Sequence, residues 1–325
     1  MKLLLGLGTI VTILLLATLL IEAALRMGFG FGSPPLYVGD EHIGYLLAPN
    51  QRLRRFGNRI HINEYSMRAK TITPLPASGT LRIFLLGDSL ANGNWWTDQR
   101  DILSARIAHY LQASIPLGDT SEDYTEIEAL NASANSWGPR NELAYLERYG
   151  TFGSAVLVLL LNTDDLFGTQ PTPLQVGRDR NYPDHNPPFA IAELLDRYLK
   201  KNQLIPGLKE IQDEGGDRVG QNLDAIEGIY QKVAADGGQF ILVLSPLKRE
   251  LPGPRDYEMV ARQRLSDWAS KTGVPYLDLL DPYQQQHDPE GLYRDHIHLS
   301  PAGNEWVAEA IAQVVIPLVA QKSSL

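Results

Sequence analysis

A continuous apolar run from Ala155 to Leu161 is the feature that most constrains how this chain can fold. A strand with one face in water alternates apolar and polar residues, and this run has no polar position. We therefore expect a central strand of a parallel sheet that is covered on both faces. Such a sheet needs helices on both sides of it, and the rest of the chain must supply them.

Apolar segments alternate with segments of helical periodicity along most of the chain. This alternation predicts an α/β fold, a three-layer flavodoxin-like sandwich with a five-stranded parallel sheet. In the flavodoxin-like order the first and third strands lie at the switch point, so residues that follow them share one crevice. The expected strands are about 81–86, 124–130, 155–161, 239–244 and 274–279, and the expected helices about 102–114, 141–148, 190–199, 219–235, 257–272 and 302–319.

The amino-terminal stretch from Leu3 to Ile21 is apolar apart from glycines and threonines, and charged residues flank it. Its length is close to the roughly 20 residues that span a bilayer. It lacks a good small-x-small cleavage site, so we expect one transmembrane helix, an uncleaved signal anchor over residues 1–27, with a cleaved signal peptide as the alternative. The positive-inside rule slightly favours an inner amino terminus, which would make the remainder periplasmic or extracellular.

Residues 28–79 are expected to form a juxtamembrane linker and an amino-terminal extension, with a short β-hairpin around Ile60 to Arg68. Four arginines of this extension, Arg52, Arg54, Arg55 and Arg59, favour a solvated rim near lipid headgroups over a site for an anionic polymer. Residues 80–325 are expected to form the α/β domain, and prolines interrupt the periodicity at about 168–217. We interpret that segment as an insertion over the strand ends, a lid or a substrate-binding region, with disorder of part of it as the alternative.

The composition excludes some classes of function. A net charge of −9 and the lack of a basic, aromatic-rich strip argue against a nucleic-acid partner. The chain has no cysteine, which excludes disulfides, thiol catalysis and thiolate metal sites.

Ser89 directly follows Gly87-Asp88, which ends the first strand, and a helix comes after it. A serine hydroxyl becomes a nucleophile when a histidine, held by a carboxylate, removes its proton. Asp295 and His298 offer that pair, with His298 as general base; without them Ser89 would be a helix-capping serine. His296 is the rival base, and a His-x-His metal pair lacks an evident third ligand, so we expect no metal site.

The sequence Gly87-Asp88-Ser89-Leu90, together with Asp295-x-x-His298, resembles the SGNH, or GDSL, hydrolase superfamily. The resemblance covers about 80–320 and extends loosely to residue 36, as in some membrane-anchored members. It implies a cofactor-free Ser-His-Asp ester hydrolase acting on acyl groups, O-acetyl groups among them, of a small molecule or a glycan. An O-acyltransferase acting on cell-envelope or extracellular glycans, and a non-catalytic glycan-binding protein on a degenerate fold, are the alternatives.

The resemblance also implies an oxyanion hole made by the Ser89 N–H, a glycine N–H and an asparagine side chain. In this chain Ser136 stands where the glycine is expected, and Gly138 follows two residues later. Asp164 stands where the asparagine is expected, and an ionised aspartate only accepts hydrogen bonds. Asn162 projects to the same face two residues earlier and is a candidate replacement; the alternatives are a protonated Asp164 or a weakened site.

Overall fold

The computed structural model describes residues 2–116, 118, 124–199 and 203–322, so residues 200–202 of the expected insertion lie outside it. Five parallel strands form the central sheet in the order β6-β5-β7-β8-β9. This is the flavodoxin-like order expected from the sequence, and β5 and β7 lie at its switch point. The strands are β5 (Thr80–Gly87), β6 (Glu126–Ser133), β7 (Val156–Asn162), β8 (Gln239–Ser245) and β9 (Tyr276–Asp278).

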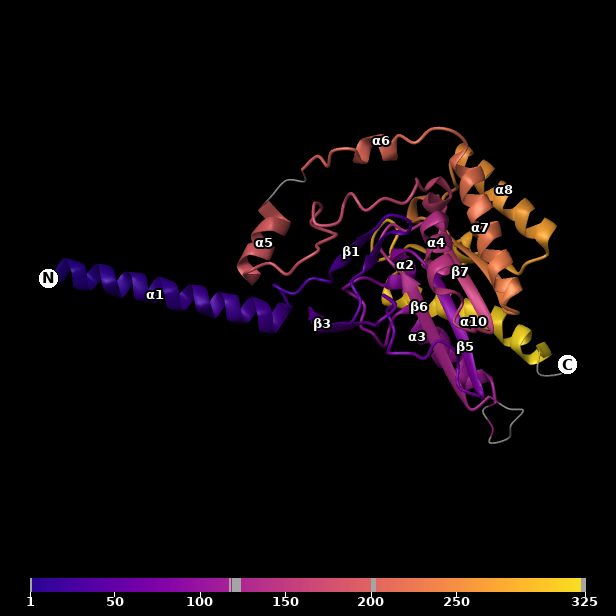
Figure 1. The fold of residues 1–325 in the computed structure, drawn as a ribbon, viewed down its shortest axis with the longest axis horizontal. Helices are drawn as coiled ribbons and strands as arrows, with labels where there is room; N and C mark the ends of the chain where they lie inside the picture. The colour runs from indigo at the N-terminus through magenta and orange to yellow at the C-terminus, as the bar shows by residue number, and fades with distance from the viewer. Residues whose placement is uncertain (1, 117, 119–123, 200–202, 323–325) are drawn as a thin grey trace.

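Helices cover both faces of the sheet, which confirms the three-layer prediction (Figure 1). Strand β7 shows the reason: Val156, Val158 and Leu160 face one apolar core, and the residues between them face the other. One core is closed by α3 (Leu103–Ser114) and α10 (Pro301–Lys322), and the other by α4 (Pro139–Tyr149), α7 (Arg218–Ala235) and α8 (Asp256–Thr272). The shorter helices are α2 (Ser89–Asn92), α9 (Leu280–Gln284), η2 (Thr163–Phe167), η3 (Lys248–Glu250) and η4 (Glu290–Leu292).

The amino-terminal extension contains two hairpins, β1 (Tyr37–Asp40) with β2 (Gly44–Leu47) and β3 (Gln51–Arg55) with β4 (Asn58–Ile62). The expected hairpin around 60–68 was therefore misplaced. The chain turns at Phe56-Gly57, both with positive φ, and not after Ile62. Beyond β4 the Asn63 side chain accepts hydrogen bonds from the N–H groups of Tyr65 and Met67, which holds a tight turn instead of a second strand.

The prediction of a solvated arginine rim was wrong for one of its four members. Arg52, Arg54 and Arg59 are exposed, but Arg55 is buried. It forms a two-pronged ion pair with Glu193 of α5 (Ala190–Leu199), with N–O distances of 2.8 and 3.1 Å. A buried guanidinium needs such a partner, and the partner lies 138 positions away in the insertion, which also contains α6 (Leu208–Gln212).

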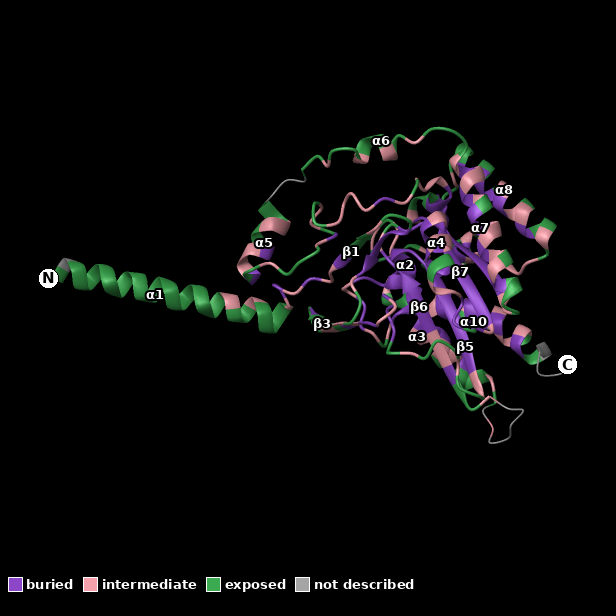
Figure 2. Ribbon diagram, in the orientation of Figure 1, coloured by how far each residue is buried: buried purple, intermediate pink, exposed green. Residues whose placement is uncertain are grey.

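The amino-terminal helix α1 (Lys2–Ala24) continues into one π-helical segment, η1 (Leu25–Phe29). It projects from the body of the protein, and its side chains are almost all exposed (Figures 1 and 2). The span from Leu4 to Phe29 has a mean hydropathy of 2.6 and is long and apolar enough to cross a membrane. Length and composition alone do not distinguish a membrane anchor from a signal sequence.

Candidate active site

Ser89 is the first residue of α2, directly beyond the carboxyl end of β5. The cap of this short helix is Asp88, whose Oδ1 accepts a hydrogen bond from the Leu90 N–H at 2.8 Å. The capping role that the sequence left open for Ser89 is thus filled by its neighbour. Gly87 allows β5 and β7 to approach closely here, because a Cβ at this position would lie 2.6 Å from the backbone oxygen of Leu160 on β7.

The fold brings Ser89 to His298, 209 positions away in the sequence. His298 Nε2 lies 3.0 Å from Ser89 Oγ, and His298 Nδ1 lies 2.8 Å from Asp295 Oδ2. Ser89 Oγ is also 3.4 Å from Asp88 Oδ2, a longer contact than the one to the imidazole. These distances are within the range at which a base takes a proton from a serine hydroxyl.

Asp295 is fixed by the turn that precedes α10. Its Oδ1 accepts hydrogen bonds from the N–H groups of Ile297 and His298, at 3.0 and 2.8 Å. Burial raises the pKa of Asp295, but these two N–H groups and the imidazole outweigh burial and leave the pKa below its usual value. Helix α10 begins at Pro301, and Ser300 Oγ accepts a hydrogen bond from the Gly303 N–H.

Trp96 packs against the catalytic histidine candidate, and sequence reasoning did not identify it. Its ring meets the His298 ring edge-on, with centroids 4.9 Å apart, and the Arg294 guanidinium lies over the Trp96 ring at 4.7 Å from its centroid. The loop that carries Trp96 is held by the buried Arg68, which donates to the carbonyls of Asn92, Asn94 and Thr97. The Trp95-Trp96 pair soon after the serine motif was the signal available in the sequence.

A cavity of about 720 Å³ opens in front of Ser89. Its lining includes every residue that the sequence proposed for the site except Asp295, which lies behind His298: Ser89, Ser136, Gly138, Asn162, Asp164 and His298. Tyr45 and Tyr182 contribute an aromatic wall, with ring centroids 5.0 Å apart. The amino-terminal extension and the insertion therefore both contribute to the cavity.

The segment after β6 carries Ser136 and Gly138, which both line the cavity but differ in backbone conformation and hydrogen bonding. Ser136 has a φ of +57°, the left-handed conformation that favours glycine, so a serine adopts the geometry of the expected glycine at some backbone strain. Its Oγ accepts a hydrogen bond from the Tyr182 hydroxyl at 3.1 Å. The Gly138 N–H, in contrast, already donates to Asn141 Oδ1 at 3.1 Å.

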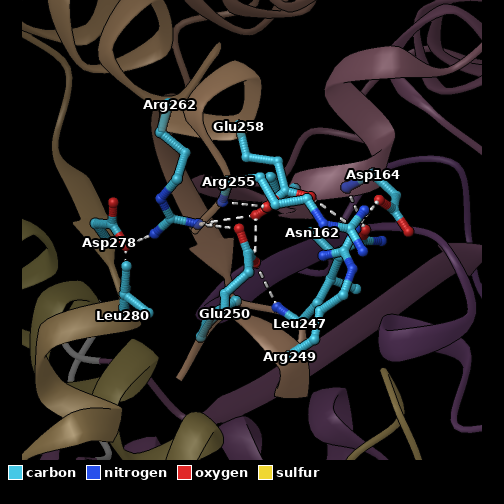
Figure 3. Close-up of polar contacts among 12 residues, drawn as sticks. Asn162, Asp164, Leu247, Arg249, Glu250, Arg255, Glu258, Arg262, Asp278 and Leu280 are labelled. Carbon is cyan, nitrogen blue, oxygen red and sulfur yellow. Dashed lines mark hydrogen bonds and ion pairs between the residues drawn. The ribbon is translucent and has the colours of Figure 1, made fainter. Parts of the chain in front are cut away.

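The Asn162 side chain lies between two carboxyl groups. Its Nδ2 donates to Asp88 Oδ2 at 3.0 Å and to Asp165 Oδ2 at 2.8 Å, and its Oδ1 accepts from the Asp164 N–H. Both amide hydrogens therefore have acceptors in this structure. The Asp164 carboxylate is more than half exposed and accepts from Arg249 Nη2 at 3.0 Å (Figure 3). Arg249 thus pairs with the negative charge of Asp164, the residue that stands where the sequence predicts an oxyanion donor.

A polar network fixes the η2 turn that carries Asp164 (Figure 3). Thr163 Oγ1 donates to Glu250 Oε2 at 2.8 Å and accepts from Arg262 Nη1 at the same distance. Arg249 of η3 bridges Asp164 of η2, at 3.0 Å, and the buried Glu258 of α8, at 2.8 Å. These contacts tie η2 to η3 and α8, so the position of Asp164 is set by elements that are remote in sequence.

Three buried carboxyl groups lie close enough to interact: Asp88 and Asp165 line the cavity, and Glu142 is near both. Burial raises the pKa of Asp88 to about 6. Burial also raises the pKa of Asp165, together with the charges of Asp88 and Glu142, and the pKa of Glu142, together with the charge of Asp88. Sequence reasoning missed this group, because Glu142 occupies an ordinary helical position and only its tertiary surroundings are unusual.

His296, the rival base, is 84% exposed, and its Nδ1 lies 3.8 Å from Asp295 Oδ1. It is therefore less favourably placed than His298. Within the described ranges, no group of three or more His, Asp or Glu side chains is arranged to hold a metal ion.

The sequence model of the GDSL-like lipase/acylhydrolase family matches residues 85–306. Similar solved structures include the acetylxylan esterase Axe2 from Geobacillus stearothermophilus, which is 14% identical with a TM-score of 0.46 and covers 71% of this chain and 92% of its own. The lipase/acylhydrolase from Enterococcus faecalis is 13% identical, with a TM-score of 0.43 and coverages of 72% and 94%. The acetyl xylan esterase AlAXEase has the same identity and TM-score, with coverages of 72% and 99%. No curated protein matched the sequence.

Proposed function

This chain belongs to the GDSL-like lipase/acylhydrolase family, and on that basis we propose that it hydrolyses acyl esters with Ser89, His298 and Asp295 as its catalytic residues. The observation that carries the proposal is the relay from Asp295 through His298 to Ser89, with contacts of 2.8 and 3.0 Å. Its three members line up at the carboxyl edge of the sheet, where α/β folds bind ligands. The substrate class we propose is an ester-linked acyl group, O-acetyl groups among them.

The proposed reaction has two acyl-transfer steps. Ser89 Oγ attacks the ester carbonyl while its proton moves to His298 Nε2, and the Nδ1–H remains hydrogen-bonded to Asp295. His298 then gives that proton to the departing alcohol, which leaves an acyl ester on Ser89. Water attacks this ester, again with its proton passing to His298, and the acid is released as Ser89 recovers its proton.

For the oxyanion we propose the backbone N–H groups of Ser89 and Ser136 as donors. Ser136 adopts the left-handed conformation typical of glycine, and its side chain lines the same cavity as Ser89. Asn162 becomes a third donor when the hydrogen bond from its Nδ2 to Asp88 or to Asp165 breaks. Asp164 does not contribute a donor; its ion pair with Arg249 reduces its repulsion of the oxyanion.

The direct test is hydrolysis of p-nitrophenyl acetate by the full chain in detergent, with Ser89→Ala and Asp164→Asn as variants. We expect Ser89→Ala to abolish activity and to leave the melting temperature close to that of the parent chain. Asp164→Asn tests the oxyanion argument, because a rise in kcat would identify the carboxylate charge as limiting. Hydrolysis that persists in Ser89→Ala would refute the assignment of the nucleophile.

An acyltransferase would use the same residues, with a sugar hydroxyl in place of water in the second step. If the chain forms the acyl-enzyme from p-nitrophenyl acetate but releases acetate only slowly, adding an acetylatable glycan should accelerate turnover. A steady-state rate that is independent of glycan supports hydrolysis. Glycan binding without any turnover that depends on Ser89 would instead indicate a binding protein.

We also propose that α1 is an uncleaved membrane anchor and that the α/β domain is periplasmic or extracellular. Residues at the end of this helix support retention, because Glu22 accepts hydrogen bonds from the Ala190 and Ile191 N–H groups and Arg26 donates to the Pro188 carbonyl. Cleavage after residue 24 would remove the two Glu22 contacts from the mature protein. Mass spectrometry of the membrane-bound protein tests this, and a mature chain that begins after residue 24 would refute it.

A further inference from the structure

Helix α5 is amphipathic, but its polar side faces the protein and its apolar side faces away from it. The side of α5 that faces the protein carries Ala190, Glu193 and Arg197. Ala190 and Glu193 are buried, and no other residue of α5 is. Its outer face carries Leu195, Tyr198 and Leu199, which are 48%, 71% and 75% exposed. In α7, by contrast, the apolar residues are the buried ones. An exposed apolar face of this kind marks a surface that binds a partner or a membrane.

Charged contacts hold α5 in this orientation. Glu193 accepts from Arg55 in two places, from Arg197 Nε at 2.9 Å and from the Gly32 N–H at 2.6 Å. Burial raises the pKa of Glu193, but the hydrogen bond and charge of Arg55 outweigh it and lower the pKa. The polar face is therefore fixed to the protein by an ionised group, and the apolar face cannot turn inward without breaking these contacts.

The amino terminus of α5 lies beside the end of α1 (Figure 1), and hydrogen bonds join the two helices. Glu22 Oε1 accepts from the Ala190 N–H at 2.8 Å and Oε2 from the Ile191 N–H at 3.1 Å, so one carboxylate caps α5 from the anchor helix. The uncharged part of the candidate span, Leu4 to Ile21, is about 27 Å long at about 1.5 Å per residue. This matches the roughly 30 Å hydrocarbon layer, so Glu22 and the start of α5 lie at the depth of the headgroups.

We propose that α5 lies in the membrane interface, with Leu195, Tyr198 and Leu199 inserted at the boundary between headgroups and acyl chains. Phe189, directly before the helix, is also exposed, at 61%. The inference rests on the proposed membrane anchor. It also places one wall of the cavity at the bilayer surface, because Arg197 of α5 lines that cavity.

The test uses the absence of cysteine from the chain, since one introduced cysteine then carries one fluorophore. Leu195→Cys and Tyr198→Cys are labelled with an environment-sensitive dye in the full chain, reconstituted in phosphatidylcholine–phosphatidylglycerol nanodiscs. Val260→Cys is the matched control, because Val260 is also an exposed apolar residue but lies on α8, away from α1 (Figure 1). Leu14→Cys reports insertion of the anchor itself.

We expect nitroxide lipids to quench the dyes at Leu195 and Tyr198 more than iodide does, and the reverse at Val260. If nitroxide lipids quench the dye at Leu14 but the dyes at Leu195 and Tyr198 behave like the dye at Val260, α1 is inserted in the membrane and the inference about α5 is overturned. If iodide quenches the dye at Leu14, α1 is not inserted in the membrane, and the proposals for the anchor and for α5 are both refuted. Shielding of Leu195 and Tyr198 from both quenchers would indicate a protein partner, such as a second copy of the chain, and would also overturn the inference.

Discussion

Replacing Gly87 with alanine should damage both stability and activity, because the added methyl group meets backbone. Its Cβ would lie 2.6 Å from the Leu160 carbonyl oxygen and 3.1 Å from the Ala91 Cβ. Real Cβ atoms essentially never approach a neighbour closer than 3.0 Å, so β5 and β7 must separate by at least 0.4 Å. Overpacking of a buried site costs about 1–3 kcal/mol. The same shift moves Ser89, two residues on, and should lower kcat roughly tenfold, since a misplacement of about 1 Å costs about 100-fold.

Gly138→Ala is the matched control, since Gly138 also lies buried at the cavity. Its Cβ would lie 3.6 Å from the nearest atom, the Asp165 carbonyl oxygen, and its φ of −140° suits any residue. We expect a change in the free energy of unfolding within about 0.5 kcal/mol. Urea denaturation and p-nitrophenyl acetate kinetics measure both effects. Equal stability and activity of Gly87→Ala and Gly138→Ala would contradict a tight approach of β5 and β7 at Gly87.

Three further predictions concern buried charges. Glu193→Met and Arg55→Met should each destabilise α5 by about 3–5 kcal/mol, because each leaves a buried charge unpaired. The double variant should recover much of that stability. Hydrogen exchange of the α5 amides measures these changes, and additive losses in the double variant would contradict the prediction. Burial raises the pKa of Glu142, so its contribution to stability is present below the unfolded pKa, near 4.5, and is lost as the pH rises through the folded pKa. Glu142→Gln should therefore gain stability relative to the parent chain between pH 5 and pH 8 in urea denaturation, and a constant difference would refute this. Arg68→Met should release the loop that packs Trp96 on His298 and lower kcat more than it raises KM, and unchanged kinetics in a folded variant would count against that role.

Local pattern was sufficient for the architecture. The apolar run at 155–161 became β7 because a strand that is covered on both faces needs apolar residues at every position. The turn from Asp295 to His298 was also readable, since its hydrogen bonds join residues only two or three positions apart. The hairpin of the extension was misplaced, because the positive φ at Phe56 is not a property that the residue type signals.

Periodicity and motif spacing were enough to predict the strand order, the helical layers and the pairing of a serine motif with an Asp-x-x-His motif. The electrostatics around these motifs depend on contacts that form only on folding. Asn162 meets Asp88 across 74 positions, Asp164 meets Arg249 across 85, and Arg55 meets Glu193 across 138. Periodicity records which side of an element is apolar, but the partner of a buried polar group depends on which elements pack together. The burial of Arg55 and the outward apolar face of α5 therefore became visible only in the folded chain.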